Sequence, residues 1–197
     1  MRHHPPSHPE RARSASRATR TLLLLLLAMA CHRGARSNDA TPPGMPRLSD
    51  AHVVAVILAA NNTDLSYARL VPARARSADV KAFAVRMTTD HTLLNARAND
   101  IALRRNIAAE EHPLSLDFRD RSAARRDILR ELEGAKFDST YIANEVQYHT
   151  ELLSALDNVL YPSARSAELK EFVNNLRPAV SAHLAHAEQL RAALMKK

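Results

Sequence analysis

Three histidines occupy positions on apolar helical stripes, where a helical protein buries its side chains. His91 fills a seven-residue gap in a stripe of apolar residues that runs from Val80 to Ile101. His149 interrupts the apolar stripe of a later segment, and His183 interrupts that of the last one. Apolar residues that recur every three or four positions mark the buried face of an α-helix. We therefore expect three imidazoles inside the protein, from three different helices.

Carboxylates lie on the same faces as these histidines. Asp64 is on the apolar stripe of the first expected helix, and Glu145 precedes His149 by four residues, on the same side of its helix. His186, three residues after His183, can share the face of that histidine. At 1.5 Å per residue from the expected helix starts, Asp64 and the first two histidines lie at similar heights. We expect a polar layer near the middle of a helical bundle.

This polar layer has two interpretations. Imidazoles and carboxylates from facing helices are how helical bundles bind iron, manganese or zinc. Such a divalent metal site would use Asp64, His91, His149 and His183, with His186 or Glu145 as further ligands. In the alternative, the layer is purely structural, and each histidine pairs with a neighbouring polar group and fixes the register of the helices. Because no nucleophile is placed for Ser-His-Asp chemistry and no glycine-rich phosphate loop occurs, we assign no catalytic residue.

The composition favours an all-α protein. Only three of the 197 residues are glycine, and alanine, leucine, arginine and glutamate dominate from Leu48 onward. We predict an up-down four-helix bundle that carries a short extra helix in its crossover. Its four long helices are expected at residues 50–71, 78–105, 138–160 and 164–195. The crossover helix is expected at residues 118–133, with Gly134 as its stop.

Residues 1–30 have the features of a secretory signal. A basic segment precedes six consecutive leucines at residues 22–27, and small residues follow. The apolar run is too short to span a bilayer as a helix. Cys31, the only cysteine, directly follows it, as in a bacterial lipoprotein signal whose cysteine becomes the lipidated first residue. The alternative is an ordinary signal peptide that is cut before Cys31 and leaves a free thiol.

Residues 31–48 are polar and contain several prolines and glycines, which is typical of a flexible tether. Residues 49–197 then form the bundle domain. We expect secretion across the inner membrane and a periplasmic position, as an outer-membrane lipoprotein that contacts the membrane through lipidated Cys31. More than half of the net charge of +7 lies in the first 30 residues, and elsewhere acids and bases are mixed. We therefore expect no nucleic-acid partner.

Ordered motifs surround the three histidines. They are Val80-Lys81-Ala82-Phe83-Ala84, Met87-x-x-Asp90-His91-Thr92, Phe137-Asp138-x-x-Tyr141-Ile142 followed by His149, and Pro178-x-x-x-x-His183-Leu184. Together they resemble the bacterial family described as domain of unknown function 4142. The resemblance covers about residues 50–194. It implies a ferritin-like bundle in the cell envelope and no established activity.

The chain departs from ferritin-like metal enzymes, which use Glu-x-x-His on two helices and a glutamate on each of the other two. The residues three positions before the histidines are Thr88, Val146 and Val180, and none is a carboxylate. Asp64 stands where the resembled family more often has glutamate. Our first hypothesis is a non-enzymatic, lipid-anchored bundle whose polar layer binds a divalent metal. The second is an interaction or scaffold protein with structural histidines, and a di-iron oxidoreductase is the third.

Overall fold

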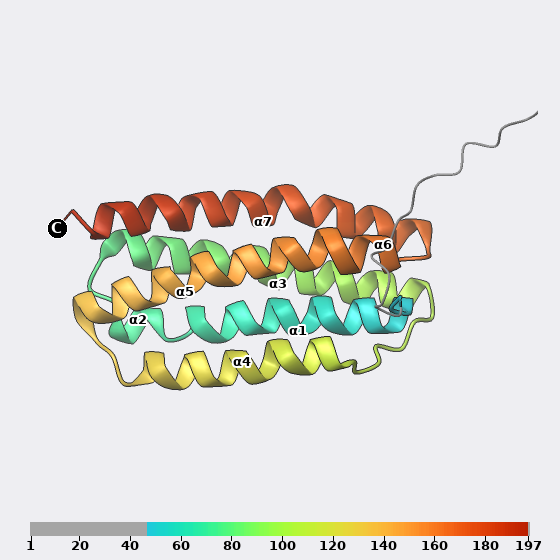
Figure 1. Cartoon of the computed structure of the whole chain (residues 1–197), viewed down its shortest axis with the longest axis horizontal. Helices are drawn as coiled ribbons and strands as arrows, with labels where there is room; N and C mark the ends of the chain where they lie inside the picture. The colour runs from blue at the N-terminus through green and yellow to red at the C-terminus, as the bar shows by residue number, and fades with distance from the viewer. Residues whose placement is uncertain (1–46, 197) are drawn as a thin grey trace, which may run out of the picture. The chain divides into compact units, whose positions relative to one another are not determined.

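Four long helices form the core of the computed structural model, which describes residues 47–196 (Figure 1). They are α1 (Asp50–Ala68), α3 (Ala78–Arg104), α5 (Gly134–Ala155) and α7 (Ala167–Leu194). The described residues include no β-strand, so the predicted all-α fold class is confirmed. No helix among them is long and apolar enough to cross a membrane. The signal segment, Cys31 and the tether as far as residue 46 lie outside the described residues and stay predictions.

Serine side chains start three of the core helices. Ser49 accepts a hydrogen bond from a backbone N–H in the first turn of α1, and Ser77 does the same for α3. Ser166 caps α7 in this way. A serine at this position satisfies one of the backbone donors that a helix leaves unpaired at its beginning.

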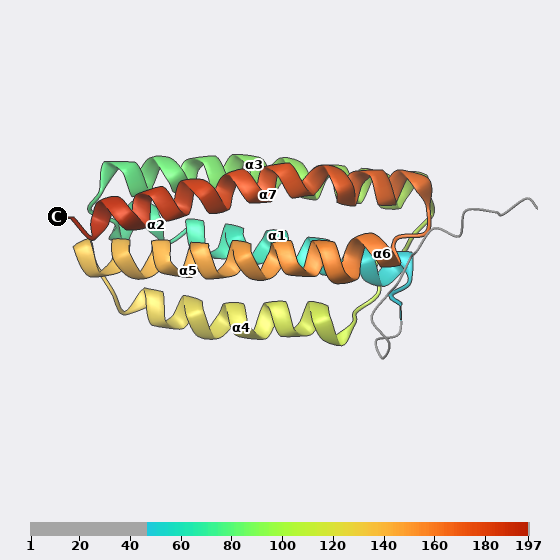
Figure 2. The same cartoon turned by 45° about the horizontal axis from the view of Figure 1, so that its top comes forward.

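The crossover is a helix that extends along the bundle. α4 (Pro113–Arg130) packs against α1 and begins five residues earlier than the sequence indicates. The side chain of His112 accepts from the N–H of Leu114, and this cap fixes the start of α4. Figure 1 shows that successive helices alternate in direction when α4 is included, so α3 and α5 run the same way. Figure 2 shows α4 on the opposite side of the bundle from α3 and α7.

Several predicted helix boundaries are wrong. The first helix ends at Ala68 rather than 71, and Pro72 lies in the first turn of a separate short helix, α2 (Val71–Arg74). Proline fits a first turn because the N–H that it lacks has no helical partner there. Gly134 does not stop the crossover helix; it begins α5, four residues before the predicted start, with φ of +62°. Glycine adopts this conformation without the steric cost that a side chain would add.

The end of the third long helix also differs from the prediction. α5 continues into a π-helical turn, η1 (Leu156–Leu160), and then into α6 (Tyr161–Ser163), so the expected break at residues 161–163 is absent. α7 begins at Ala167, three residues after the predicted start. Pro178 lies inside α7, as the sequence indicates.

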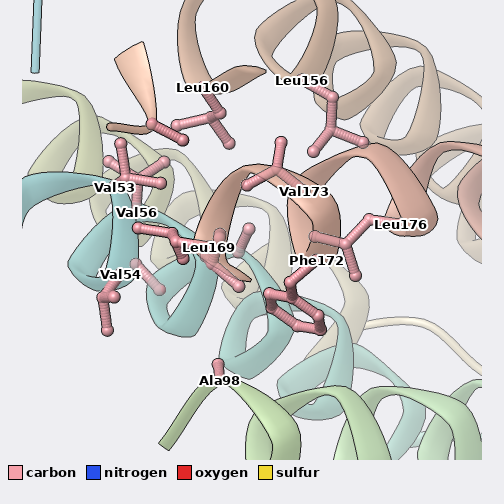
Figure 3. Packing of buried hydrophobic residues seen from close by; sticks show 14 of the residues in the cluster. Val53, Val54, Val56, Ala98, Leu156, Leu160, Leu169, Phe172, Val173 and Leu176 are labelled. Atoms are coloured by element: carbon pink, nitrogen blue, oxygen red, sulfur yellow. The ribbon is translucent and has the colours of Figure 1, made fainter. Parts of the chain in front are cut away.

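Apolar side chains fill the core in two clusters. The first includes Val53, Leu160 and Leu169 and is drawn in Figure 3, and the second includes Phe83 and Phe137. Along α1, α3 and α7 the polar layer falls between the residues of the two clusters, and in α5 Glu145 and His149 flank the point where the two clusters meet, at Val146 and Tyr148. Leu48, the last residue of the predicted tether, is 3% exposed and belongs to the first cluster. Its N–H donates to the hydroxyl of Ser163, so the packed body includes Leu48.

Candidate metal centre

Each of the four core helices contributes at least one ionisable side chain to the middle of the bundle. Asp64 comes from α1, His91 from α3, His149 from α5 and His183 from α7, and none is more than 1% exposed. Glu145 is equally buried, one turn before His149 in α5. The structure therefore places five of the six predicted ligands together. We call these five residues the histidine–carboxylate centre.

Short distances connect the members of this centre. Oδ2 of Asp64 lies 3.3 Å from Nε2 of His91 and 3.5 Å from Nε2 of His149. One ring nitrogen from each of the three histidines lies within 4.8 Å of the others. Ligand atoms of Asp64, Glu145 and His149 are equally close to one another. Because both sets contain His149, they form one centre rather than two separate sites.

A hydrogen bond orients each of the three imidazoles. The three contacts are His91 Nδ1 with Asn61 Oδ1 (2.9 Å), His149 Nδ1 with the backbone carbonyl oxygen of Glu145 (2.9 Å), and His183 Nε2 with Asp90 Oδ2 (2.8 Å). All three partner atoms are oxygen acceptors. A neutral imidazole carries one N–H and one lone pair, so each ring donates here and keeps its lone pair on the opposite nitrogen.

Those opposite nitrogens have no hydrogen-bond partner among the described residues. They are Nε2 of His91, Nε2 of His149 and Nδ1 of His183. The carboxyl oxygens of Asp64 and Glu145 have no hydrogen-bond partner there either, although Oε2 of Glu145 lies 3.4 Å from Nδ1 of His149. Buried polar atoms are nearly always paired, because each unpaired one costs roughly 1–3 kcal/mol. A metal ion accepts such lone pairs, and the donors closest to one another are those of the three histidines and those of Asp64, Glu145 and His149. The donor set therefore fits a cation.

Burial and mutual charge set the ionisation of the centre. Burial raises the pKa of Glu145 well above its usual value, and the nearby charge of Asp64 raises it further. For Asp64, burial also acts to raise the pKa, but interactions with the histidines outweigh burial and lower it. Burial lowers the pKa of His149 to about 4 and lowers that of His183. At neutral pH the imidazole of His149 is therefore neutral, which is the form that binds metals.

Buried tyrosines lie beside the carboxylates. The Tyr148 hydroxyl donates to the carbonyl oxygen of Ala60 at 2.6 Å, and its ring stands edge-on to that of His149. Tyr141 is fully buried, and its hydroxyl has no hydrogen-bond partner among the described residues. Burial raises the pKa of Tyr141 and of Tyr148 well above its usual value, and the charge of Asp64 raises it further in both. Both phenols therefore stay protonated at neutral pH.

His186, the sixth predicted ligand, lies outside the centre. It is half-buried, and its ring packs edge-on against Phe83 with 5.1 Å between the ring centroids. It belongs to none of the clusters of close ligand atoms within the described residues. Three residues advance a helix by about 4.5 Å, so His186 stands in the next layer of α7.

Neither Asn61 nor Asp90 is among the predicted site residues, although each one holds a histidine. Asn61 lies one turn before Asp64 on the inner face of α1. Asp90 immediately precedes His91, but it contacts the histidine of a different helix, His183. The sequence offers one indication of this role, because both residues lie within three positions of a predicted ligand. Metal-binding histidines usually have an oxygen acceptor on the second nitrogen.

The fold and this centre define a class of protein: an α-helical bundle with a buried histidine–carboxylate centre. The family model described as "Domain of unknown function (DUF4142)" matches residues 35–190, and the chain belongs to this family. The resemblance inferred from the motifs is therefore confirmed. No curated protein and no solved structure matches the chain.

Proposed function

We propose that this protein binds one divalent metal ion in the histidine–carboxylate centre and that it is not an enzyme. One observation carries the proposal. Three buried imidazoles are each oriented by an acceptor on one nitrogen, and each leaves the other nitrogen unpaired inside the bundle. Histidines that ligate metals are held in this way, because the second hydrogen bond fixes the tautomer and the orientation of the ring.

The donor chemistry narrows the choice of metal. The centre offers imidazole nitrogens from His91, His149 and His183, carboxylate oxygens from Asp64 and Glu145, and no thiolate. Nitrogen together with carboxylate oxygen suits iron, manganese or zinc, whereas calcium and magnesium prefer oxygen alone. Bound there, the ion would link the four core helices at mid-height.

The hydrogen bond of His149 supports one ion rather than two. Its Nδ1 donates to the carbonyl oxygen of Glu145, so its single lone pair is on Nε2 and can serve one ion only. Both sets of close ligand atoms include His149. Together with the missing Glu-x-x-His motifs, this argues against a di-iron oxidoreductase.

We also propose that the protein acts in the cell envelope, attached to a membrane through lipidated Cys31. The support is the sequence of residues 1–31: a basic segment, a short leucine run and a single cysteine directly after it. Incorporation of labelled palmitate into the wild-type chain, and its loss in Cys31→Ser, is the expected result. Equal labelling of both chains would contradict the anchor.

Equilibrium dialysis tests the metal proposal. The full chain, without a histidine tag, is dialysed against Zn²⁺, Mn²⁺ or Fe²⁺, and bound metal is measured by mass spectrometry. We expect about one ion per chain for at least one of these metals. His91→Ala and His149→Ala should each weaken binding by at least about 100-fold. His52→Ala, near the start of α1, is the control and should bind like wild type. Wild-type binding below about a tenth of an ion per chain would overturn the proposal.

A purely structural polar layer is the second candidate. The contacts of His91 with Asn61 and of His183 with Asp90 would fix the register of α1, α3 and α7 without any ion. The two candidates differ in their response to a chelator. A bound ion at about 100 times its Kd adds about 2.7 kcal/mol to the free energy of unfolding. A structural layer predicts the same melting temperature with and without chelator.

A further inference from the structure

Asp90 joins the buried centre to solvent. Its Oδ2 accepts the hydrogen bond from Nε2 of His183, whose side chain is 1% exposed, yet the side chain of Asp90 is 35% exposed. The other two acceptors, Asn61 and the backbone carbonyl of Glu145, belong to buried residues. Of the three groups that hold the histidines, Asp90 alone reaches the surface.

Arg86 contacts the same carboxyl group from the surface. Its Nε lies 3.4 Å from Oδ2 of Asp90, the atom that also holds His183, and its side chain is 54% exposed. One carboxylate oxygen is thus shared between a surface cation and a buried imidazole. Any cation that approaches Asp90 from solvent competes with Arg86 for this group.

The surrounding helices leave this position accessible. Asp90 is on α3 and His183 on α7, and the line along which these two helices meet is called here the α3–α7 seam. The crossover helix α4 packs on α1 and contacts α5. In Figures 1 and 2, α4 lies across the bundle from α3 and α7, and no other described helix covers the seam.

We infer that the metal ion exchanges with solvent through Asp90, along the α3–α7 seam, and that Asp90 positions His183 for binding. The inference rests on the proposed metal-binding function. A partly exposed carboxylate raises the local concentration of cations and so their association rate. By accepting the N–H on Nε2, Asp90 also keeps the lone pair of His183 on the buried Nδ1. Arg86 slows the exchange because it neutralises the same oxygen.

Stopped-flow mixing with Co²⁺ measures the exchange. The visible absorption of bound Co²⁺ is followed for the metal-free full chain and for Asp90→Asn, which keeps the size and an oxygen acceptor but loses the charge. Asp90→Asn should slow association on the order of tenfold. Arg86→Gln should accelerate it. The controls are Asp100→Asn and Arg104→Gln, a second pair four residues apart on α3. Within the described residues, Arg104 contacts Asp100 and Glu168 rather than a histidine. Both should match wild type.

The ¹⁵N NMR spectrum tests the positioning role without any metal. We expect the N–H of His183 on Nε2 in wild type and in Asp90→Asn, and a mixture of tautomers in Asp90→Ala. Asp90→Ala should also weaken Co²⁺ binding about 10–100-fold at equilibrium. An unchanged melting temperature of the metal-free chain separates this effect from a loss of folding.

The proposed metal binding and the proposed role of Asp90 are overturned by different results. If the wild-type chain binds no Co²⁺ and none of the dialysed metals, the proposed function is overturned and the inference is overturned with it. If wild type binds Co²⁺ but both Asp90 variants match Asp100→Asn in rate, affinity and tautomer, the inference alone is overturned.

Discussion

Glu145 is a buried acid whose pKa is raised well above its usual value, first of all by burial. Its carboxyl group is fully buried, and neither oxygen has a hydrogen-bond partner among the described residues. Asp64 lies beside it, and a second negative charge in the same buried space would be costly. Glu145 therefore keeps its proton in the metal-free protein while Asp64 is ionised. A cation removes this conflict because it can bind both carboxylates.

Replacing Glu145 should change how stability depends on pH. A raised pKa means that Glu145 contributes stability below its ordinary value of 4.5, and that this contribution is lost as pH rises toward its folded-state pKa. Glu145→Gln removes that dependence. In chelator, the free energy of unfolding of the variant relative to wild type should therefore increase between about pH 5 and pH 8. Urea denaturation measures the difference, and Glu188→Gln, at an exposed position, is measured in parallel. A constant difference between Glu145→Gln and wild type across this pH range would contradict this ionisation.

The two histidines of α7 provide a matched pair. His183 belongs to the centre, whereas His186 packs against Phe83. His183→Ala should weaken metal binding by at least about 100-fold, because it removes a ligand. His186→Ala removes an imidazole from the same helix and should leave the affinity unchanged. Isothermal titration measures both, and equal effects would show that the assignment of ligands along α7 is wrong.

At the scale of helices, two aspartates tie the beginning of one helix to another. The carboxylate of Asp138 in α5 accepts from the N–H groups of Arg76 and Ser77, directly before α3. At the other end of the bundle, Asp50 in α1 accepts from two N–H groups directly before α7. These contacts set where α3 and α7 begin, and thus the heights of His91 and His183.

Removing the Asp138 carboxylate should destabilise the protein. Asp138→Ala leaves two backbone N–H groups beside a buried site without their acceptor, and each costs roughly 1–3 kcal/mol. We expect a loss of about 3 kcal/mol in the free energy of unfolding, measured by urea denaturation. Asp120→Ala, on the exposed side of α4, is the control and should change stability by less than about 0.5 kcal/mol. A similar loss for both variants would contradict this role.

Helix positions and inner faces follow from the sequence because a 3.6-residue period is a local property. That period is sufficient to place Asp64, His91, His149 and His183 inside the bundle. The boundary at Gly134 is not predictable locally, since a glycine with positive φ suits a helix end as well as a loop that leads into the next helix. Its place depends on a bridge to Ala75, far away in sequence.

The partners of the histidines could not be predicted for the same physical reason. Asn61 reaches His91 across 30 residues of chain, and Asp90 reaches His183 across 93. Such contacts depend on how the helices pack, which the periodicity of each helix does not determine. His186 shows the same limit of periodicity. A spacing of three residues from His183 is compatible with the same helix face, but it does not show whether His186 lies at the height of the centre.

For the whole molecule, the centre lies between two apolar clusters that hold the four helices on either side. In this arrangement, the apolar residues that stabilise the fold are different from the residues proposed to bind the metal. The first cluster contains Leu169, Leu160 and Val53 and supplies burial at one end, while the second contains Phe83 and Phe137. Neither cluster includes a residue of the centre. A substitution deep in a cluster should therefore change the stability of the fold more than its metal affinity.

Leu169→Ala tests this separation. Leu169 is fully buried, so truncation should lower the free energy of unfolding by about 2–5 kcal/mol. Metal affinity, measured by titration well below the melting temperature, should remain within about threefold of wild type. Leu103→Ala is the control, because Leu103 is largely exposed, and it should alter neither quantity. A large loss of affinity in Leu169→Ala would mean that the cluster and the centre are coupled.

The most direct test of the metal centre is anomalous X-ray scattering from crystals of the full chain grown with Zn²⁺ or Mn²⁺, at the absorption edge of the metal. We predict one strong peak enclosed by His91, His149 and His183, within bonding distance of Asp64. Crystals of His149→Ala should lack this peak. A peak found only at surface histidines such as His52, or no peak at all under saturating metal, would contradict a metal centre in this bundle.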